Sequence, residues 1–321
     1  MFDDTTVVTA LAGYDQLRSD AAWRPLDSVR SVSLAGDDRK GWLQGQITQD
    51  LRDLPATGSC HACLLKPTGQ IEAVLGVWAL PDRFLILTEA PEFLLDRAKR
   101  FVILENVRPA LEECQVVTIQ GPKATQRLSS LMDLPVGDAG LAELEGEPVT
   151  VLRSRRVYGG GWDVVLPSLE GAAGRRLTDA LPLASAEAFD IAMIEAGTPV
   201  FGIDIDSKTL PPEMGHHFVA SHVSYDKGCY TGQEVVARIQ SRGHTNRTWV
   251  GLAGSGPLAP GAEARDRSGT VVGMVARAGK SPVFGWIGTA MLRNHVAESG
   301  SAVWIDGVSA EVTQLPFEGR E

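Results

Sequence analysis

The 321-residue sequence has few cysteines and no long apolar run. Its four cysteines, Cys60, Cys63, Cys114 and Cys229, are too scattered to cross-link a chain of this length, so we expect reduced thiols. No segment approaches the ~20 consecutive apolar residues of a transmembrane helix, and the acidic N-terminus lacks the pattern of a secretion or transit signal. These absences predict a cytoplasmic protein without a membrane partner.

Basic residues are also fewer than acidic residues. Thirty Lys and Arg residues stand against forty Asp and Glu residues, which gives a net charge of −10. This is the wrong sign for a protein that holds nucleic acid by neutralising many phosphates. We therefore expect no direct nucleic-acid partner.

The first 245 residues alternate short strands with amphipathic helices. Residues 31–34 alternate like a strand, and Asp37 can N-cap a following helix. The buried stripe of that helix is predicted to be Leu43, Ile47 and Leu51. The same strand and helix pattern returns 85 positions later, over 117–131, which indicates an internal repeat.

Between the two copies, segments 59–65, 71–80 and 84–88 predict an antiparallel meander. Further helices are expected from Pro91, near 168–181 and over 185–196. Sheets covered by helices on one face, an α+β fold, explain this order best.

From residue 246 the pattern changes to short apolar runs separated by glycine-rich turns, with little helical periodicity. We predict that residues 246–321 form a small C-terminal β-barrel or sandwich, separate from the α+β region of residues 1–245.

The segment 225–243, YDKGCYTGQEVVARIQSRG, contains a candidate functional thiol. Thr231 and Glu234 have the spacing of a capping box that opens a helix, which places Cys229 two residues before the N-cap. The helix dipole and the ammonium of Lys227 would both lower the pKa of this thiol. The alternative is a small side chain that fills a tight turn.

Residues 227–234, KGCYTGQE, match a signature of the YgfZ-like proteins in full, and residues 42–50 and 194–199 match two further motifs of that family. The sequence therefore resembles the YgfZ/GcvT-like folate-binding family, which is related to the T-protein of the glycine cleavage system. The resemblance implies two intertwined, ferredoxin-like α+β folate-binding modules, a C-terminal β-barrel, and a central hole lined by all three parts.

The resemblance also implies a folate site. Glu195 lies where the T-protein has its pterin-binding glutamate, and a carboxylate can accept two hydrogen bonds from a pterin edge. Phe189 lies near a position where the family has an aromatic residue, and Val29 where some members have a tryptophan. The other residues predicted at the site are Lys227, Tyr230, Gln233, Arg238 and Arg242. Without the resemblance, Glu195 and the two arginines would read as surface residues, and Phe189 as a core residue.

The implied function is binding of tetrahydrofolate or a derivative, with Cys229 assisting iron–sulfur cluster assembly or repair in client enzymes and an indirect effect on tRNA modification. The implied partners are a reduced folate and iron–sulfur client proteins or assembly factors. Residues 88–96 do not reproduce the T-protein motif that contains its assisting aspartate, although Asp96 is near, and typical T-proteins lack the cysteine signature. Aminomethyltransferase activity is therefore not expected. A folate-dependent one-carbon transferase with another substrate remains the alternative.

No metal site is predicted. Cys60 and Cys63 have CxxC spacing, but residues three apart in a strand face opposite sides, and no further ligands accompany them. His216, His217 and His222 lack a regular metal-binding spacing and are expected in a loop.

Overall fold

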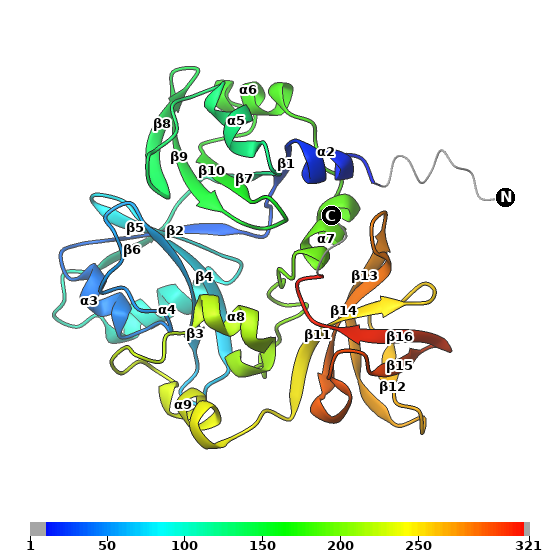
Figure 1. Cartoon of the computed structure of the whole chain (residues 1–321). Helices are drawn as coiled ribbons and strands as arrows, with labels where there is room; N and C mark the ends of the chain where they lie inside the picture. Colours follow the sequence, from blue (N-terminus) through cyan, green and yellow to red (C-terminus); the bar gives the residue numbers. More distant parts are fainter. Residues whose placement is uncertain (1–10, 318–321) are drawn as a thin grey trace.

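The computed structural model describes residues 11–317, in which two five-stranded antiparallel sheets and a closed six-stranded barrel lie around a common centre (Figure 1). The α+β fold with a C-terminal barrel agrees with the expectation from sequence. No helix within these residues is both long and apolar enough to cross a membrane.

The first sheet contains the predicted meander. Its strands, in spatial order, are β3 (Ser59–Leu65), β4 (Ile71–Ala79), β5 (Arg83–Thr88), β2 (Arg30–Ala35) and β6 (Arg108–Leu111). Helices α3 (Arg39–Gln44) and α4 (Pro91–Phe101) cover one face. Strand alternation explains how this sheet is packed on both sides: Phe84 and Ile86 join the helix-facing core, whereas Leu85 and Leu87 join a core on the opposite face.

The second sheet repeats this arrangement. Its strands, in spatial order, are β1 (Ala22–Pro25), β7 (Gln115–Gln120), β10 (Gly161–Leu166), β9 (Glu147–Ser154) and β8 (Ala139–Leu144). Helices α5 (Ala124–Ser129) and α6 (Ala172–Ala180) pack on its outer face. Because β2 begins at Arg30 and β7 at Gln115, 85 residues later, the repeat predicted from sequence is confirmed at the level of topology.

The two modules are intertwined through their edge strands. Strand β6, which follows α4, completes the first sheet beside β2, whereas the equivalent edge of the second sheet is filled by β1, which precedes β2 in the chain. The chain therefore passes from one sheet to the other before the first module is built. A shared core, which includes Leu85, Val116, Leu152 and Val165, packs the sheets against each other.

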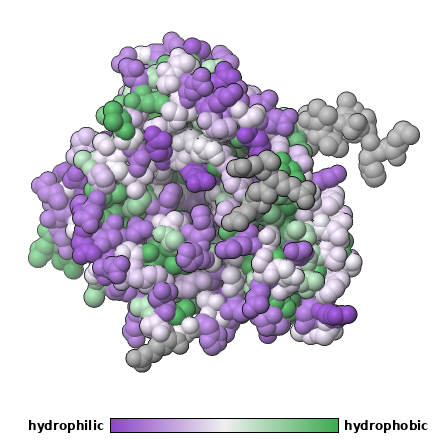
Figure 2. Space-filling view, viewed as in Figure 1, coloured by the Kyte–Doolittle hydropathy of each residue, from purple (hydrophilic) through white to green (hydrophobic). Residues whose placement is uncertain are grey.

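Four further helices lie outside these modules and the barrel. They are α2 (Tyr14–Ser19), α7 (Ala186–Glu195), α8 (Gly215–His222) and α9 (Gln233–Arg242), and the 3₁₀ turn Pro211–Met214 precedes α8. The barrel strands are β11 (Arg247–Gly254), β12 (Glu263–Arg265), β13 (Val271–Ser281), β14 (Gly285–Arg293), β15 (Ala302–Ile305) and β16 (Val308–Thr313), and the 3₁₀ turn Asn294–Val296 follows β14. Polar side chains cover most of the molecular face in Figure 2, and apolar residues are scattered over it.

A buried acidic group anchors the barrel to the segment after α7. The Asp204 carboxylate accepts hydrogen bonds from Trp249 Nε1 (3.0 Å) on β11 and Thr289 Oγ1 (2.5 Å) on β14. Arg277 Nε lies 2.8 Å from the other oxygen of Asp204, and its guanidinium also contacts Asp190 on α7 at 2.8 Å. The charge of Asp204 is thus compensated although its side chain has no solvent exposure.

The structure corrects one helix. Asp38, not Asp37, precedes α3, and no side chain caps the helix. The helix ends at Gln44, so Ile47 and Leu51 are fully buried, as predicted, but from the irregular segment after it. The spacing of these apolar residues resembles a helical period, although both residues are buried outside the helix.

Replacing Asp204 by alanine is expected to lower the free energy of unfolding by about 3–5 kcal/mol, because it removes one of the two carboxylates that contact the buried Arg277 guanidinium and leaves Trp249 Nε1 and Thr289 Oγ1 without their acceptor. Urea unfolding followed by tryptophan fluorescence would measure this change. Asp179→Ala, on the exposed side of α6, is the matched control and should change stability by less than about 0.5 kcal/mol. Equal midpoints for the two variants would contradict the anchor.

Candidate functional site

A cavity of about 360 Å³ lies where the two sheets meet the segment after α7 and helix α8. The first sheet contributes residues of β3, β4 and β5, and the second module contributes Ser154, Arg155, Arg156, Tyr158 and Asp163. Residues 196–199, α8 and Pro316 complete the wall. The volume lies in the range of roughly 300–1,000 Å³ that small-molecule sites occupy.

Aromatic rings form much of the cavity wall. Phe218 and His222 of α8 stack with ring centroids 3.8 Å apart and planes 10° apart. His61 on β3 lies with its ring centroid 5.3 Å from that of His222 and 6.3 Å from the ring of Trp78 on β4. A flat, partly apolar ligand ring fits such walls.

Two of the three histidines that line the cavity, His61 and His222, have pKa values below the ordinary range of an imidazole. Burial lowers the pKa of His222 to about 3, and the neighbouring His61 adds to the shift. Desolvation by the surrounding cavity walls also lowers the pKa of His61, and the positive charge of Arg156 contributes to the shift. His222 Nδ1 lies 3.0 Å from the Phe218 carbonyl oxygen and 2.8 Å from Ser221 Oγ, so this nitrogen is engaged by its own helix.

A buried ion pair fixes one cationic group at the cavity. The Asp163 carboxylate, which has no solvent exposure, accepts bonds from Arg156 Nε (3.1 Å) and Nη2 (2.7 Å). Ser154 donates to the same carboxylate at 2.9 Å, and Gln120 donates to Ser154 at 2.8 Å. These partners hold the guanidinium in one orientation.

Glu89 is the second acidic residue that lines the cavity, after Asp163. It lies between the end of β5 at Thr88 and the start of α4 at Pro91, and it lines the cavity together with Arg156. Burial raises the pKa of Glu89, while the nearby charge of Arg156 opposes this shift. A carboxyl group and a guanidinium are thus both available to a ligand from opposite sheets.

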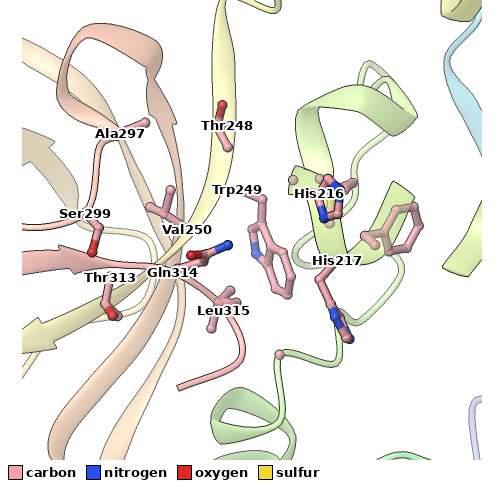
Figure 3. Close-up of a pocket in the computed structure, with 14 residues that line it drawn as sticks. His216, His217, Thr248, Trp249, Val250, Ala297, Ser299, Thr313, Gln314 and Leu315 are labelled. Carbon is pink, nitrogen blue, oxygen red and sulfur yellow. The ribbon is translucent and has the colours of Figure 1, made fainter. Parts of the chain in front are cut away.

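A second, smaller cavity of about 200 Å³ separates α8 from the barrel (Figure 3). Trp249 on β11 and Leu315 of the C-terminal segment face His216 and His217 across it (Figure 3). His217 and Phe218 line both cavities, so α8 forms the wall between them.

Glu195, the predicted pterin partner, is the last residue of α7 and is fully buried, not a surface residue. Its Oε1 accepts hydrogen bonds from Tyr14 Oη and Ser281 Oγ, both at 2.6 Å, and its Oε2 lies 3.5 Å from Arg18 Nη1. The cavity wall begins at the next residue, Ala196. A role for Glu195 in pterin binding stays a prediction.

Phe189 packs in a small core with Leu17, Val157 and Ala192, and it is not among the described residues that line the cavity. Its stacking role also stays a prediction. Val29, where some family members have a tryptophan, does line the cavity.

The residues of the cysteine signature lie against the first module, where Gly232 contacts the turn between β3 and β4. Lys227 Nζ donates to the carbonyl oxygens of Gln44, Ile47 and Gln49, each at 2.7 Å, and lies 5.2 Å from the ring centroid of Tyr230. Lys227 and Tyr230 are both buried. They hold the loop against the first module, and their roles in folate binding stay predictions.

The capping box predicted at Thr231 and Glu234 does not form. Helix α9 begins at Gln233, its N-cap is Gly232, and no side chain caps it. Gly232 has φ +83°, and a Cβ there would lie 2.6 Å from the Lys66 carbonyl oxygen, so only glycine fits this turn. Cys229 is a free, exposed thiol in the preceding loop.

None of residues 227–234 is among the described residues that line the cavity. Gln233 is half-buried and Arg238 is exposed at α9, and the side chain of Arg242 lies outside the described part of the chain. The signature residues therefore lie outside the described cavity lining, and their contribution to a ligand site stays a prediction.

The candidate site residues that sequence reasoning did not predict are four polar residues of the cavity lining, His61, Glu89, Arg156 and Asp163. No linear motif connects them, because they come from both sheets. The expected loop at His216, His217 and His222 was wrong, since all three lie on α8. Cys60 and Cys63 belong to different cores on the two faces of β3, and residues 11–317 contain no cluster able to hold a metal ion.

These features define an α+β protein in which a repeated pair of sheets, the segment after α7 and helix α8 surround a cavity of small-ligand size, with the barrel beside it. The family model described as the GCVT N-terminal domain matches residues 9–224, and the chain belongs to this family.

Its relatives divide between two kinds of protein. The chain is 27% identical to the tRNA-modifying protein YgfZ of Photorhabdus laumondii, with 92% of each chain covered. It is 26% identical to an aminomethyltransferase of Chloroherpeton thalassium, with 88% of this chain and 83% of that protein covered. The crystal structure of the glycine cleavage system aminomethyltransferase T of Bartonella henselae matches the fold with a TM-score of 0.83 at 20% identity, covering 95% of this chain and 88% of that one.

Cys229 is expected to react with a maleimide at least about tenfold faster than the other three cysteines in the native protein. It is exposed, whereas burial raises the pKa of Cys60 to about 12 and also raises the pKa values of Cys63 and Cys114. Time-resolved peptide mass spectrometry would measure the order of labelling. Cys229→Ser should remove the fast phase, and a fast phase at Cys114 in that variant would contradict the assignment.

Proposed function

We propose that the chain binds tetrahydrofolate or a derivative in the central cavity. The observation that carries this proposal is the cavity itself: it lies at the junction of the two modules and the barrel-linked segments of a GCVT-family fold. Its aromatic walls suit a flat pterin or benzoate ring, and its polar groups suit the hydrogen-bonding edge of a pterin.

We propose further that the protein is a binding and assembly factor that supports iron–sulfur cluster assembly or repair in client enzymes. The KGCYTGQE signature and the similarity to a YgfZ protein over 92% of both chains support this assignment. The exposed position of Cys229, away from the cavity lining, suits a thiol that acts on a partner protein rather than on the folate.

An effect on tRNA modification would be indirect, through client enzymes. The relative from Photorhabdus laumondii is described as tRNA-modifying, but the net charge of −10 opposes the neutralisation of many RNA phosphates by this chain.

A second candidate function is a folate-dependent one-carbon or aminomethyl transferase. It is favoured by the similarity to aminomethyltransferases in sequence and fold. Turnover of a reduced folate by the purified protein would decide in its favour.

Calorimetric titration of tetrahydrofolate into the protein, under anaerobic and reducing conditions, is expected to show one saturable site. Because the ligand rings leave water for an apolar wall, the heat-capacity change of binding should be negative. Absence of saturable heat at two temperatures, confirmed by equilibrium dialysis, would overturn the folate proposal.

Cys229→Ser is expected to lower the activity of iron–sulfur client enzymes in cells that depend on this protein, without weakening tetrahydrofolate binding in vitro. The matched control is Cys114→Ser, because that thiol is half-buried beside Glu112 and has no part in the signature. Full client activity with Cys229→Ser would contradict a functional thiol and favour a structural one.

A further inference from the structure

The loop between α4 and β6 exposes three apolar side chains to solvent. Phe101 is 51% exposed, Ile103 80% and Leu104 95%. Single exposed apolar residues are common on protein surfaces, but three within four positions form a cluster of the kind that marks an interaction site. We infer that this cluster, the α4–β6 patch, docks a partner protein whose apolar pocket is bordered by acidic residues.

The backbone of the loop is fixed by neighbouring groups. The Glu105 carboxylate accepts hydrogen bonds from the amides of Ile103 (2.9 Å) and Leu104 (3.1 Å), and these bonds hold the pKa of Glu105 below its usual range. At the start of the loop, Trp42 Nε1 donates to the Phe101 carbonyl oxygen at 3.3 Å. The apolar side chains are thus held in one arrangement before a partner binds, which lowers the entropic cost of association.

The charged groups around the patch differ in how they are compensated. Arg100 and Arg108, which flank it in the chain, are exposed and have no hydrogen-bond or ion-pair partner within the described part of the protein. The acidic groups are engaged: Glu105 by the two loop amides, and Asp38 by the Asn106 amide at 2.7 Å. The two arginines are therefore the charges that a partner can pair, and carboxylates at the rim of its pocket would complement them.

A second copy of the chain is a less favourable occupant. Strand β6 is an edge strand, and the Glu112 amide donates to the Ser31 carbonyl oxygen of β2 at 2.9 Å. By strand alternation, Pro109 then faces the free edge, where it has no N–H to donate, so regular strand addition is blocked. A two-fold contact through the patch would also bring the unpaired arginines of both copies together.

An anionic lipid surface is a less favourable occupant as well. Asp37 and Asp38 lie beside the loop, where both contact Asn106, and Glu105 is exposed within it. A bilayer presents negative charge over the whole contact area and would repel these carboxylates. A protein can place its acidic groups opposite the two arginines alone, so the mixed charge of the loop favours a protein.

The inference goes beyond the proposed function, because none of the patch residues is among the described residues that line the central cavity, and none belongs to the cysteine signature. It rests on the proposed function only for the identity of the partner, which would be an iron–sulfur client enzyme or an assembly factor.

The test begins with the photoreactive residue p-benzoylphenylalanine at position 104, and at position 126 on α5 as an exposed control. In cells that depend on this protein, position 104 is expected to cross-link a partner protein that position 126 does not. The cross-linked protein is then purified, and its binding to the purified chain is measured by calorimetry at low and high salt. The inference requires this binding to be reproduced with the two purified proteins.

Leu104→Asp should weaken binding of that partner roughly 10- to 100-fold, and Arg100→Glu should weaken it and reduce its dependence on salt. Leu141→Asp, which alters another exposed leucine on β8 of the second sheet, is the matched control and should change the affinity by less than about twofold. All three side chains are exposed, so the melting temperatures of the variants should stay close to that of the wild type.

Different failures have different meanings. Cross-linking at position 104 no stronger than at position 126, or equal affinities for Leu104→Asp and Leu141→Asp, would overturn the docking surface. A cross-link to a second copy of the chain or to lipid would overturn the assignment of a partner protein. A partner that binds through the patch, but neither carries nor assembles an iron–sulfur cluster, would support the docking surface and overturn the proposed function.

Discussion

The buried carboxylate of Glu195 is the constraint on which the assembly of the three parts depends. A carboxyl group without solvent exposure needs hydrogen-bond partners within the protein, and Glu195 finds them on α2 and on the barrel strand β13. Burial and the hydrogen bond to Glu195 raise the pKa of Tyr14, which keeps its phenol protonated as a donor. One side chain at the end of α7 thereby joins the N-terminal helix, the central helix and the barrel.

The position of the cavity follows from that junction. The backbone of residues 196–199 forms part of the cavity wall immediately after Glu195, and Thr198 Oγ1 donates to the Arg156 carbonyl oxygen of the second sheet at 2.8 Å. The Phe317 amide donates to the carbonyl oxygen of Glu195 at 2.9 Å, which returns the C-terminal segment to the same place. The second module, the barrel and the C-terminal segment are thus held together by contacts at the end of α7, next to the cavity.

The structure places the cavity and the cysteine signature on different parts of the first module. Strand β3 connects them: His61 lines the cavity, and the turn after Leu65 supports Gly232 and α9. Lys227 ties the signature loop to the segment after α3 through three carbonyl oxygens. The cavity inside the molecule and the exposed thiol of Cys229 are therefore separate sites, joined through the first module.

Much of the architecture could be predicted from the sequence because its periodicity is local. The meander strands, the 85-residue repeat and the strand-rich C-terminal region are confirmed, since each depends on alternation or turn residues within a few positions. Short polar segments were less predictable: α8 was expected as a loop, and α3 was extended by Ile47 and Leu51, which are buried outside any helix.

The sequence by itself determined the repeat, the α+β class, the barrel region and the signature that marks the family. Only the tertiary structure decided which polar groups face the cavity, because Glu89, Arg156 and His61 come from different strands and loops and share no spacing. The same holds for Glu195, whose partners Tyr14 and Ser281 are 181 and 86 residues away. Local patterns specify strands and helices, whereas the environment of a charged group depends on which distant segments pack around it.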